Sequence, residues 1–136
     1  MMKGKKTFTI IKPDAYAKGY TGSIIKHIEN SGFVLKNMKL IRLNKENAHK
    51  FYAIHKEKPF YNDLCEYMSS GPIVVITLEK ENAVEDFRKL IGSTNPGKAE
   101  EGTIRKLYAT SIQENAIHGS DSDDNAEIES NFFFNK

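Results

Sequence analysis

Pro72-Ile73-Val74-Val75-Ile76-Thr77-Leu78 is the stretch of this sequence that decides the fold. It is β-branched almost throughout and has no polar alternation, which is typical of a strand buried on both faces. Such a strand needs other strands beside it and helices packed over it. The rest of the chain must therefore contain the elements that pair with this strand and cover it.

Segments on either side supply those elements. Further strands are expected at 7–11, 33–43 and 116–118, and helices at 22–31, 44–55, 60–68, 82–91 and 126–134. The segment Lys12-Pro13-Asp14 predicts a turn after the first strand. The order of these elements indicates one α+β domain over residues 1–136, with an antiparallel sheet covered by helices. Residues 93–115 carry little periodicity, and a loop of that length is usually functional.

Composition limits the class of protein. The chain has 136 residues, 39% hydrophobic and 28% charged, with a net charge of +2 and one cysteine, Cys65. It is long enough to bury a core without disulfides, and no apolar run approaches the ~20 residues of a membrane span. We expect a cytoplasmic protein without a membrane partner. Residues 1–61 hold 13 basic and four acidic side chains, a surplus that is either a solvated face or attracts polyphosphate or nucleic acid.

Two motifs almost match and fail. The segment 92–99 fits the phosphate loop G-x-x-x-x-G-K, but Ala99 stands where a hydroxyl is needed and the segment follows a predicted helix. Residues 121–125 copy the start of a calcium loop. Ala126 and Phe132 then occupy the positions of the required glycine and bidentate glutamate. We therefore expect neither site.

His118 is the candidate nucleophile. It ends a short apolar run and is followed by Gly119 and a helix start, where backbone N–H groups favour a phosphoryl group. Glu129 on that helix could accept an N–H from the ring and fix its tautomer. A structural histidine is the alternative interpretation. The other histidines, His27, His49 and His55, fall among helical charges and are expected to be solvated.

The octet Asn115-Ala116-Ile117-His118-Gly119-Ser120-Asp121-Ser122 is similar to the active-site signature of nucleoside diphosphate kinases. Further blocks resemble that family in order and spacing: Thr9 to Asp14, Lys58 to Tyr61, Met68 to Pro72, Gly92 to Pro96 and Gly102 to Arg105. The resemblance extends over roughly residues 6–130. Several blocks at consistent separations make chance agreement very improbable.

This resemblance implies a ferredoxin-like βαββαβ sheet with a long nucleotide-site loop. It implies a ping-pong kinase in which His118 takes the γ-phosphate of a nucleoside triphosphate and passes it to a nucleoside diphosphate, balancing nucleotide pools. Mg²⁺ would be held mainly by the nucleotide phosphates, with Asp121 as an indirect contact. The family's homo-oligomers are built from dimers, and tetramer and hexamer remain open.

The resemblance also implies roles around the transferred phosphate. Lys12, Arg88 and Arg105 match phosphate-contacting cations, which phosphoryl transfer needs to neutralise the moving oxygens. Thr94 matches a hydroxyl donor to the phosphates. Tyr52 matches a tyrosine whose hydroxyl lies near the histidine.

The remaining matches concern the ring, the sugar and the base. Ser120 and Glu129 match the pair that orients the catalytic ring, and Asn115 matches the amide that contacts the ribose 3′-hydroxyl. Phe60 and Ile112 resemble a base clamp, where stacking accepts every base. Ordinary core packing is the alternative for these two.

The chain also departs from the family's pattern, and a rival function remains. Phe51, Glu101 and Lys106-Leu107-Tyr108 replace residues usual in the family, and the aromatic run 132–134 predicts burial. The rival is a nucleic-acid-binding module on the same fold, suggested by the basic first half. That class needs an aromatic-rich strand motif that this sequence lacks, so we expect no specific nucleic-acid partner.

Overall fold

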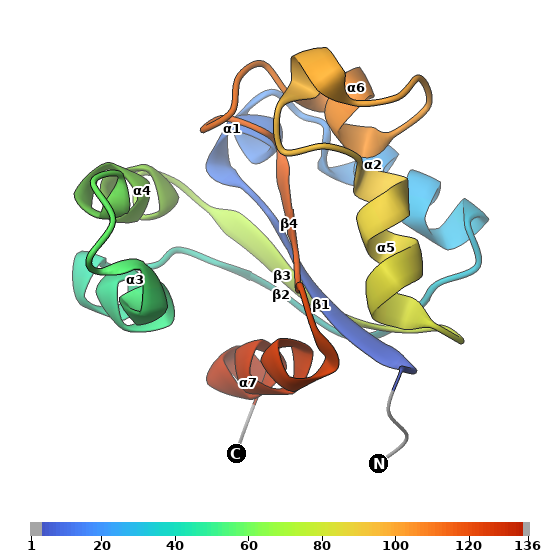
Figure 1. Ribbon diagram of the computed structural model, residues 1–136, viewed down its shortest axis with the longest axis horizontal. Coiled ribbons are helices and arrows are strands. Elements are labelled where there is room, and N and C mark those ends of the chain that lie inside the picture. Colours follow the sequence, from blue (N-terminus) through green and yellow to red (C-terminus); the bar gives the residue numbers. More distant parts are fainter. Residues whose placement is uncertain (1–3, 135–136) are drawn as a thin grey trace.

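The computed structural model describes residues 4–134. It contains one antiparallel sheet with the strand order β2-β3-β1-β4 (Figure 1). The strands are β1 (Lys6–Ile11), β2 (Val34–Ile41), β3 (Ile73–Glu79) and β4 (Ile117–Gly119). This order confirms the expected ferredoxin-like α+β fold. The predicted domain of residues 1–136 includes residues 1–3, 135 and 136, which lie outside the described part.

β3 is the central strand that its sequence predicts. It pairs with β1 on one side, where Thr9 lies opposite Ile76, and with β2 on the other, where Met38 lies opposite the same residue. Ile73 to Leu78 are all buried, and Glu79 is exposed at the end. The pleat of the strand turns successive side chains to opposite faces of the sheet, so residues 74, 76 and 78 join one core and residues 73 and 75 join the other.

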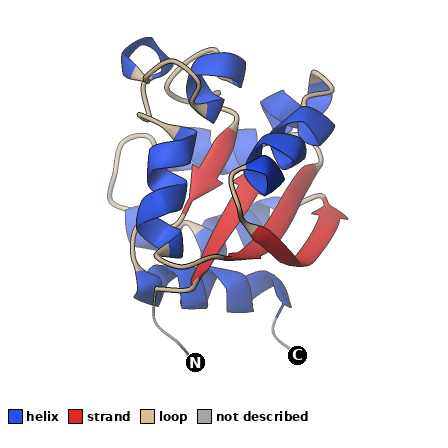
Figure 2. Ribbon diagram, turned by 90° about the vertical axis from the view of Figure 1, so that its right-hand side faces the viewer, coloured by secondary structure: helices blue, strands red, loops and turns tan. Residues whose placement is uncertain are grey.

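Helices cover both faces of the sheet, and Figure 2 shows the strands between them. One face carries the core cluster around Phe87 and is covered by α1 (Pro13–Ala17), α2 (Thr21–Asn30), α5 (Ala83–Ile91) and α6 (Ile104–Tyr108). The other carries the cluster around Phe8 and is covered by α3 (Lys45–Phe51), α4 (Tyr61–Met68) and α7 (Asp123–Phe134). Two short 3₁₀ turns, Ala53–His55 and Pro96–Lys98, complete the elements.

Side chains and glycines set the helix ends. The Asn44 side chain accepts the backbone N–H of Asn47 at the start of α3, and Ser122 does the same for Asn125 at the start of α7. Gly32 follows α2 with φ +96° and Gly92 follows α5 with φ +90°, a region that favours glycine. The predicted start of α3 and the predicted ends of α2 and α5 are correct to within one residue, whereas α7 begins three residues before the predicted 126 and α3 ends four residues before the predicted 55.

Two short helices differ from the expectation. The segment expected as a turn at Lys12-Pro13-Asp14 begins α1, because proline at the first helical position fits a helix start. The loop 93–115 contains α6, whose N-cap Thr103 accepts the N–H of Lys106. Five residues are too few for a periodic pattern, so neither helix shows a helical repeat in the sequence. Among the described residues no helix is long and apolar enough to cross a membrane.

Candidate active site

A cavity of about 840 Å³ opens beside the end of β4. Its wall is built by segments distant in the sequence: the residue after β1, the helices α5, α6 and α7, and the loop between α5 and α6. Eight of the twelve site residues expected from the sequence line it: Lys12, Arg88, Thr94, Arg105, Asn115, His118, Asp121 and Glu129. The volume falls in the range usual for small-molecule sites.

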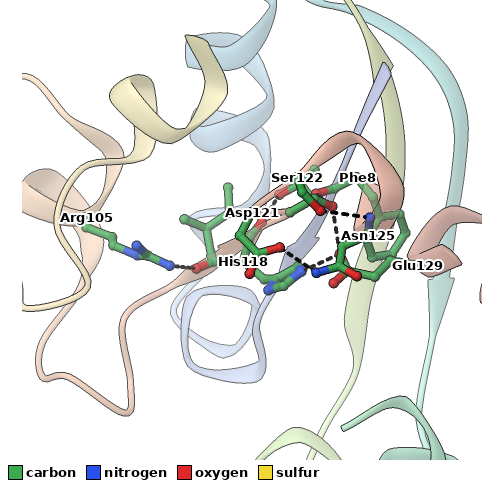
Figure 3. Close-up of polar contacts among 10 residues, drawn as sticks. Phe8, Arg105, His118, Asp121, Ser122, Asn125 and Glu129 are labelled. Atoms are coloured by element: carbon green, nitrogen blue, oxygen red, sulfur yellow. Dashed lines mark hydrogen bonds and ion pairs between the residues drawn. The ribbon is translucent and has the colours of Figure 1, made fainter. Parts of the chain in front are cut away.

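His118 is held at this wall by a carboxylate. Its Nε2 lies 2.8 Å from Oε1 of Glu129, which also accepts a hydrogen bond of 2.6 Å from the Ser120 hydroxyl (Figure 3). Because an ionised carboxylate only accepts, the hydrogen in this contact belongs to Nε2. Nδ1 of His118 then carries the free lone pair and is the nucleophilic nitrogen.

The short strand β4 fixes the position of this ring. The backbone N–H of Ile117 bonds the carbonyl of Asn115 at 2.8 Å, a three-residue turn with Ala116 at φ +75°. Beyond the histidine, a Cβ on Gly119 would lie 2.9 Å from Cδ1 of Ile91, so only glycine fits there without movement. The positive φ of Ala116 is a strained backbone conformation, and such strain persists where the surrounding structure enforces it, commonly at functional sites.

Arg105 is anchored by two backbone carbonyls. Its guanidinium donates to Gly92 at 3.1 Å and to Ile117 at 2.7 Å. The side chain is 8% exposed, and among the described residues its Nε has no partner. Burial, and then the nearby charge of Arg88, lower the pKa of Arg105 to about 10. The group remains a cation at neutral pH and ties the loop after α5 to β4.

Lys12 forms the second buried cation. Its Nζ donates to Oδ1 of Asn115 at 2.8 Å, and the amide nitrogen of Asn115 donates to the carbonyl of Thr94 at 3.3 Å. Burial, and then the charge of Arg105, lower the pKa of Lys12 to about 7 against the opposing effect of Asp14. Lys12 is therefore a poorly solvated cation that an anionic ligand would stabilise.

The rim of the cavity is more open. Arg88 on α5 and Thr94 in the following loop are exposed at its edge. Asp121 lies on the opposite side, where its Oδ1 accepts a hydrogen bond of 2.5 Å from Asn125. The cavity is thus lined by the basic side chains and the Thr94 hydroxyl, and by the carboxylates of Asp121 and Glu129 near His118.

Tyr52 lies behind the cavity wall. It is 6% exposed and packs against the rings of Phe51 and His55. Its hydroxyl is buried without a partner among the described residues. Burial, and next the charge of Glu129, raise the pKa of Tyr52, so the phenol stays protonated and free to donate.

Phe60 and Ile112 lie on the surface, so the core-packing alternative is wrong for both. Phe60 is 46% exposed and Ile112 is 59% exposed, and neither lines the cavity. The Phe60 ring lies 5.7 Å from that of His55, which does line it. His55, which was expected to be solvated, is partly exposed and lines the cavity, a position that its sequence surroundings did not indicate.

Of the departures noted in the sequence, Phe51 and residues 106–108 lie in helices, whereas Glu101 lies in a turn before α6. Lys106-Leu107-Tyr108 forms the second half of α6, and the Tyr108 ring packs 5.0 Å from that of Tyr20. Phe51 packs against Phe132 and Phe133 and edge-on to His118 at 6.1 Å. The aromatic end of α7 is thus partly buried against the same cluster that supports the histidine.

The comparisons with known proteins agree with this geometry. The family model described as nucleoside diphosphate kinase matches residues 5–136. Nucleoside diphosphate kinase of Flavobacterium psychrophilum is 57% identical, covering 98% of this chain and 96% of the relative. The Chlorobaculum tepidum enzyme of the same name is 60% identical over 96% and 93%.

Solved structures give the same result. The Aquifex aeolicus nucleoside diphosphate kinase superposes with a TM-score of 0.93 at 41% identity, covering 96% of this chain and 94% of that one. A Halobacterium salinarum nucleoside diphosphate kinase in complex with CDP gives 0.92 at 36% identity, over 96% and 88%. Together with the family match along nearly the whole sequence, these comparisons show that the chain belongs to the nucleoside diphosphate kinase family.

Proposed function

We propose that this protein transfers the γ-phosphate of a nucleoside triphosphate to a nucleoside diphosphate through a phosphohistidine at His118. The observation that carries the proposal is the ring of His118, bonded through Nε2 to Glu129 at the wall of the cavity. A nucleophile oriented by a carboxylate beside several cations suits phosphoryl transfer. Family membership supports the same activity.

The reaction has two matching halves. The Nδ1 lone pair attacks the γ-phosphorus, the bond to the bridging oxygen breaks, and the nucleoside diphosphate leaves with the electron pair. A terminal phosphate oxygen of the second diphosphate then attacks the phosphohistidine and breaks the P–N bond. Glu129 compensates the positive charge that develops on the ring, and Ser120 holds Glu129 in place.

The cations and the tyrosine act on the phosphate oxygens. Lys12 and Arg105 stabilise the transferred group from the buried side, and Arg88 and Thr94 bind the remaining phosphates at the rim. The two buried cations cost the free protein desolvation energy, which phosphate binding offsets. The unpartnered hydroxyl of Tyr52 donates to the phosphohistidine or the phosphate.

The base and sugar sit toward the outer end of the site. Phe60 and Ile112 are exposed apolar side chains, which a stacked base would cover without reading its edge. The site is therefore expected to accept nucleotides with any base. Asn115, already bonded to Lys12, contacts the ribose 3′-hydroxyl and so links the sugar to the phosphate-binding cation.

Magnesium fits this site as a partner of the nucleotide. Among residues 4–134 no group of three or more histidine, cysteine or acidic side chains could hold a metal ion by itself. Asp121 at the rim is the carboxylate suited to a contact through water. When bound, the ion supplies positive charge to the phosphate oxygens.

The nucleic-acid module is the weaker candidate. An RNA-recognition sheet needs one open face on which bases stack. Helices cover both faces of this sheet in the described part of the chain. The basic residues Lys12, Arg88 and Arg105 are instead gathered at the cavity.

The assembly and location follow from the same family membership. We propose one domain that assembles into dimers through β2, an edge strand on which Met38 and Leu40 are 51% and 60% exposed. Edge strands with apolar side chains commonly pair with another chain.

A cytoplasmic location suits the free, buried thiol of Cys65 and nucleotide substrates.

Initial-rate kinetics test the proposed function. With ATP and GDP varied together, a ping-pong enzyme gives parallel double-reciprocal lines. Replacing His118→Asn should abolish exchange. His27→Asn makes the same change on α2, away from the cavity lining, and should leave exchange intact. Converging lines, or turnover by the His118 variant, would reject the mechanism.

A further inference from the structure

The strand that carries His118 is short and lies at an edge of the sheet. β4 has three residues, and among the described strands it pairs with β1 alone. The residue before it, Ala116, has the strained φ of +75°. A short edge strand has few contacts to keep it in place, so its central residue, His118, depends on bonds from side chains as well as on strand pairing.

A side chain of β1 supplies such a bond. The Thr9 hydroxyl donates a hydrogen bond of 2.7 Å to the backbone carbonyl of His118. Thr9 is fully buried, and its β-branched side chain has few rotamers, so the hydroxyl keeps a fixed direction. Next to it, the carbonyl of Phe8 accepts the backbone N–H of Ser120 at 3.2 Å and its hydroxyl at 3.4 Å. β1 therefore holds both residues that bond Glu129.

Burial alone does not require the bond from Thr9. Thr7 lies two residues earlier on the same strand and on the same face of the sheet, and it is equally buried. Its hydroxyl has no hydrogen-bond partner among residues 4–134. β1 thus contains one buried threonine that bonds the residue of the nucleophile and one that bonds nothing, and the two can be compared directly.

Thr9 reaches the nucleophile through the backbone. Strand alternation places its side chain on the same face as Ile11, whereas Phe8 lies on the opposite face and contacts the His118 ring edge-on at 6.2 Å. Thr9 is not among the residues that line the cavity. Its bond therefore fixes the backbone of His118 from the side of the sheet away from the ring.

We propose that Thr9 is a positioning residue, whose hydrogen bond to the His118 carbonyl holds the ring where Nε2 bonds Glu129 and Nδ1 is directed at the phosphate. The proposal rests on the proposed function, because it takes His118 as the nucleophile. Misplacing a reacting group by about 1 Å can cost about 10²-fold in rate, so we expect a smaller shift of the ring to cost about tenfold.

Single-turnover phosphorylation by γ-labelled ATP tests this, because it separates binding from chemistry. Thr9→Val removes the hydroxyl and keeps the branching of the side chain. Its rate constant at saturating ATP should fall about tenfold, while the ATP concentration that gives half of this rate stays unchanged, because Thr9 does not touch the cavity. Thr9→Ser keeps the hydroxyl and should stay close to wild type. Thr7→Val makes the same change two residues away and should leave the rate constant unchanged.

The ring ¹⁵N chemical shifts of His118 in the nucleotide-free protein give a readout that does not depend on activity. Wild type, Thr9→Ser and Thr7→Val should show one tautomer with the hydrogen on Nε2. Thr9→Val should show a mixture of both tautomers, because the contact of 2.8 Å with Glu129 is loosened. Thr9→Ala removes the same hydroxyl and replaces Thr9→Val in both measurements if circular dichroism shows that the valine variant does not fold.

The controls decide between positioning and packing. A wild-type rate or an unchanged tautomer in Thr9→Val would overturn the proposal. An equal loss in Thr7→Val or in Thr9→Ser would overturn it as well, since packing and not the hydrogen bond would then be responsible. A wild-type protein that takes up no label would reject the proposed function instead, and the ring shifts would still show whether Thr9 positions His118.

Discussion

At His118 the chemistry depends on a single hydrogen bond. Nε2 is committed to Glu129 at 2.8 Å, and this commitment leaves Nδ1 free as the attacking atom. The His118 ring also contacts Phe8 and Phe51 edge-on, so aromatic packing restrains it in addition to the hydrogen bond. Loss of the Glu129 carboxylate would leave the His118 ring packed between its aromatic neighbours. It would remove the contact that determines which ring nitrogen carries the hydrogen.

Replacing Glu129→Ala should therefore lower kcat by about 10²–10⁴-fold, the span typical of losing a group that orients a reacting partner. Glu127→Ala provides the control on the same helix, because Glu127 pairs with Lys6 and lies outside the cavity lining. Steady-state rates of phosphate exchange for both variants test the role of Glu129. Equal rates in the two would remove Glu129 from the mechanism.

The buried charge of Lys12 has a cost in stability. A folded-state pKa near 7, below the unfolded value of 10.5, means that protonation favours unfolding, fully below pH 7 and less as pH rises toward 10.5. Lys12→Met should stabilise the fold at pH 6 by about 1–4 kcal/mol, the range seen when buried ionic groups become apolar. The gain should shrink by pH 9. Thermal unfolding at both pH values measures it, and a gain independent of pH would contradict this account.

Single residues differ in how far the sequence could foretell them. His118 and Glu129 were paired in the prediction by position alone, and they do meet in the structure. His55 could not be placed, because its entry into the cavity wall depends on a 3₁₀ turn and on neighbouring rings. The buried pair Asp14 and Tyr67 joins residues 53 apart with no local pattern to mark it.

Among the elements, the junction of α5 with α6 has little room for change. Gly92 ends α5 at φ +90°, its carbonyl accepts from Arg105, and a Cβ there would lie 2.6 Å from Oγ1 of Thr103. Gly92→Ala should destabilise the fold by about 2–4 kcal/mol, from the left-handed backbone and the collision together. It should also lower nucleotide affinity, because displacement of the residue 92 carbonyl would weaken one of the two anchors of Arg105.

Gly22→Ala is the matched control. Gly22 lies within α2, with open space where its Cβ would be, so alanine should stabilise the protein by about 0.4–1 kcal/mol. Urea unfolding of both variants compares them directly. Similar free energies of unfolding for the two variants would show that the junction of α5 with α6 tolerates movement.

Elements with a pattern of their own were predictable from the sequence, and the short helices α1 and α6 were not. β3, α2 and α5 each have enough residues to show a buried run or a helical repeat, and their ends carry glycines or caps. α1 and α6 have five residues each, and their positions depend on contacts with the sheet rather than on their own pattern. The sequence predicted the layers of the fold and, through the family resemblance, eight residues of the cavity wall, whereas the short helices that position some of them required the structure.

At the scale of the molecule, β2 is the surface expected to join two copies. Its side chains at Met38 and Leu40 lie on one face of an edge strand and are exposed. Leu40→Lys should lower the mass in solution to the 15.4 kDa monomer, whereas wild type should have at least twice that mass. Ile128→Lys, at an exposed apolar position on α7, is the control. Light scattering measures the masses, and an unchanged assembly in Leu40→Lys would place the interface elsewhere.

The covalent intermediate is the central claim for the whole molecule. Purified protein is mixed with Mg²⁺ and γ-labelled ATP without an acceptor, separated from free nucleotide, and then given GDP. We predict an acid-labile, base-stable label on the wild type, none on His118→Asn, and transfer of the label to GTP once GDP is added. A folded, nucleotide-bound protein that takes up no label, or a label that remains when GDP is present, would contradict transfer through His118.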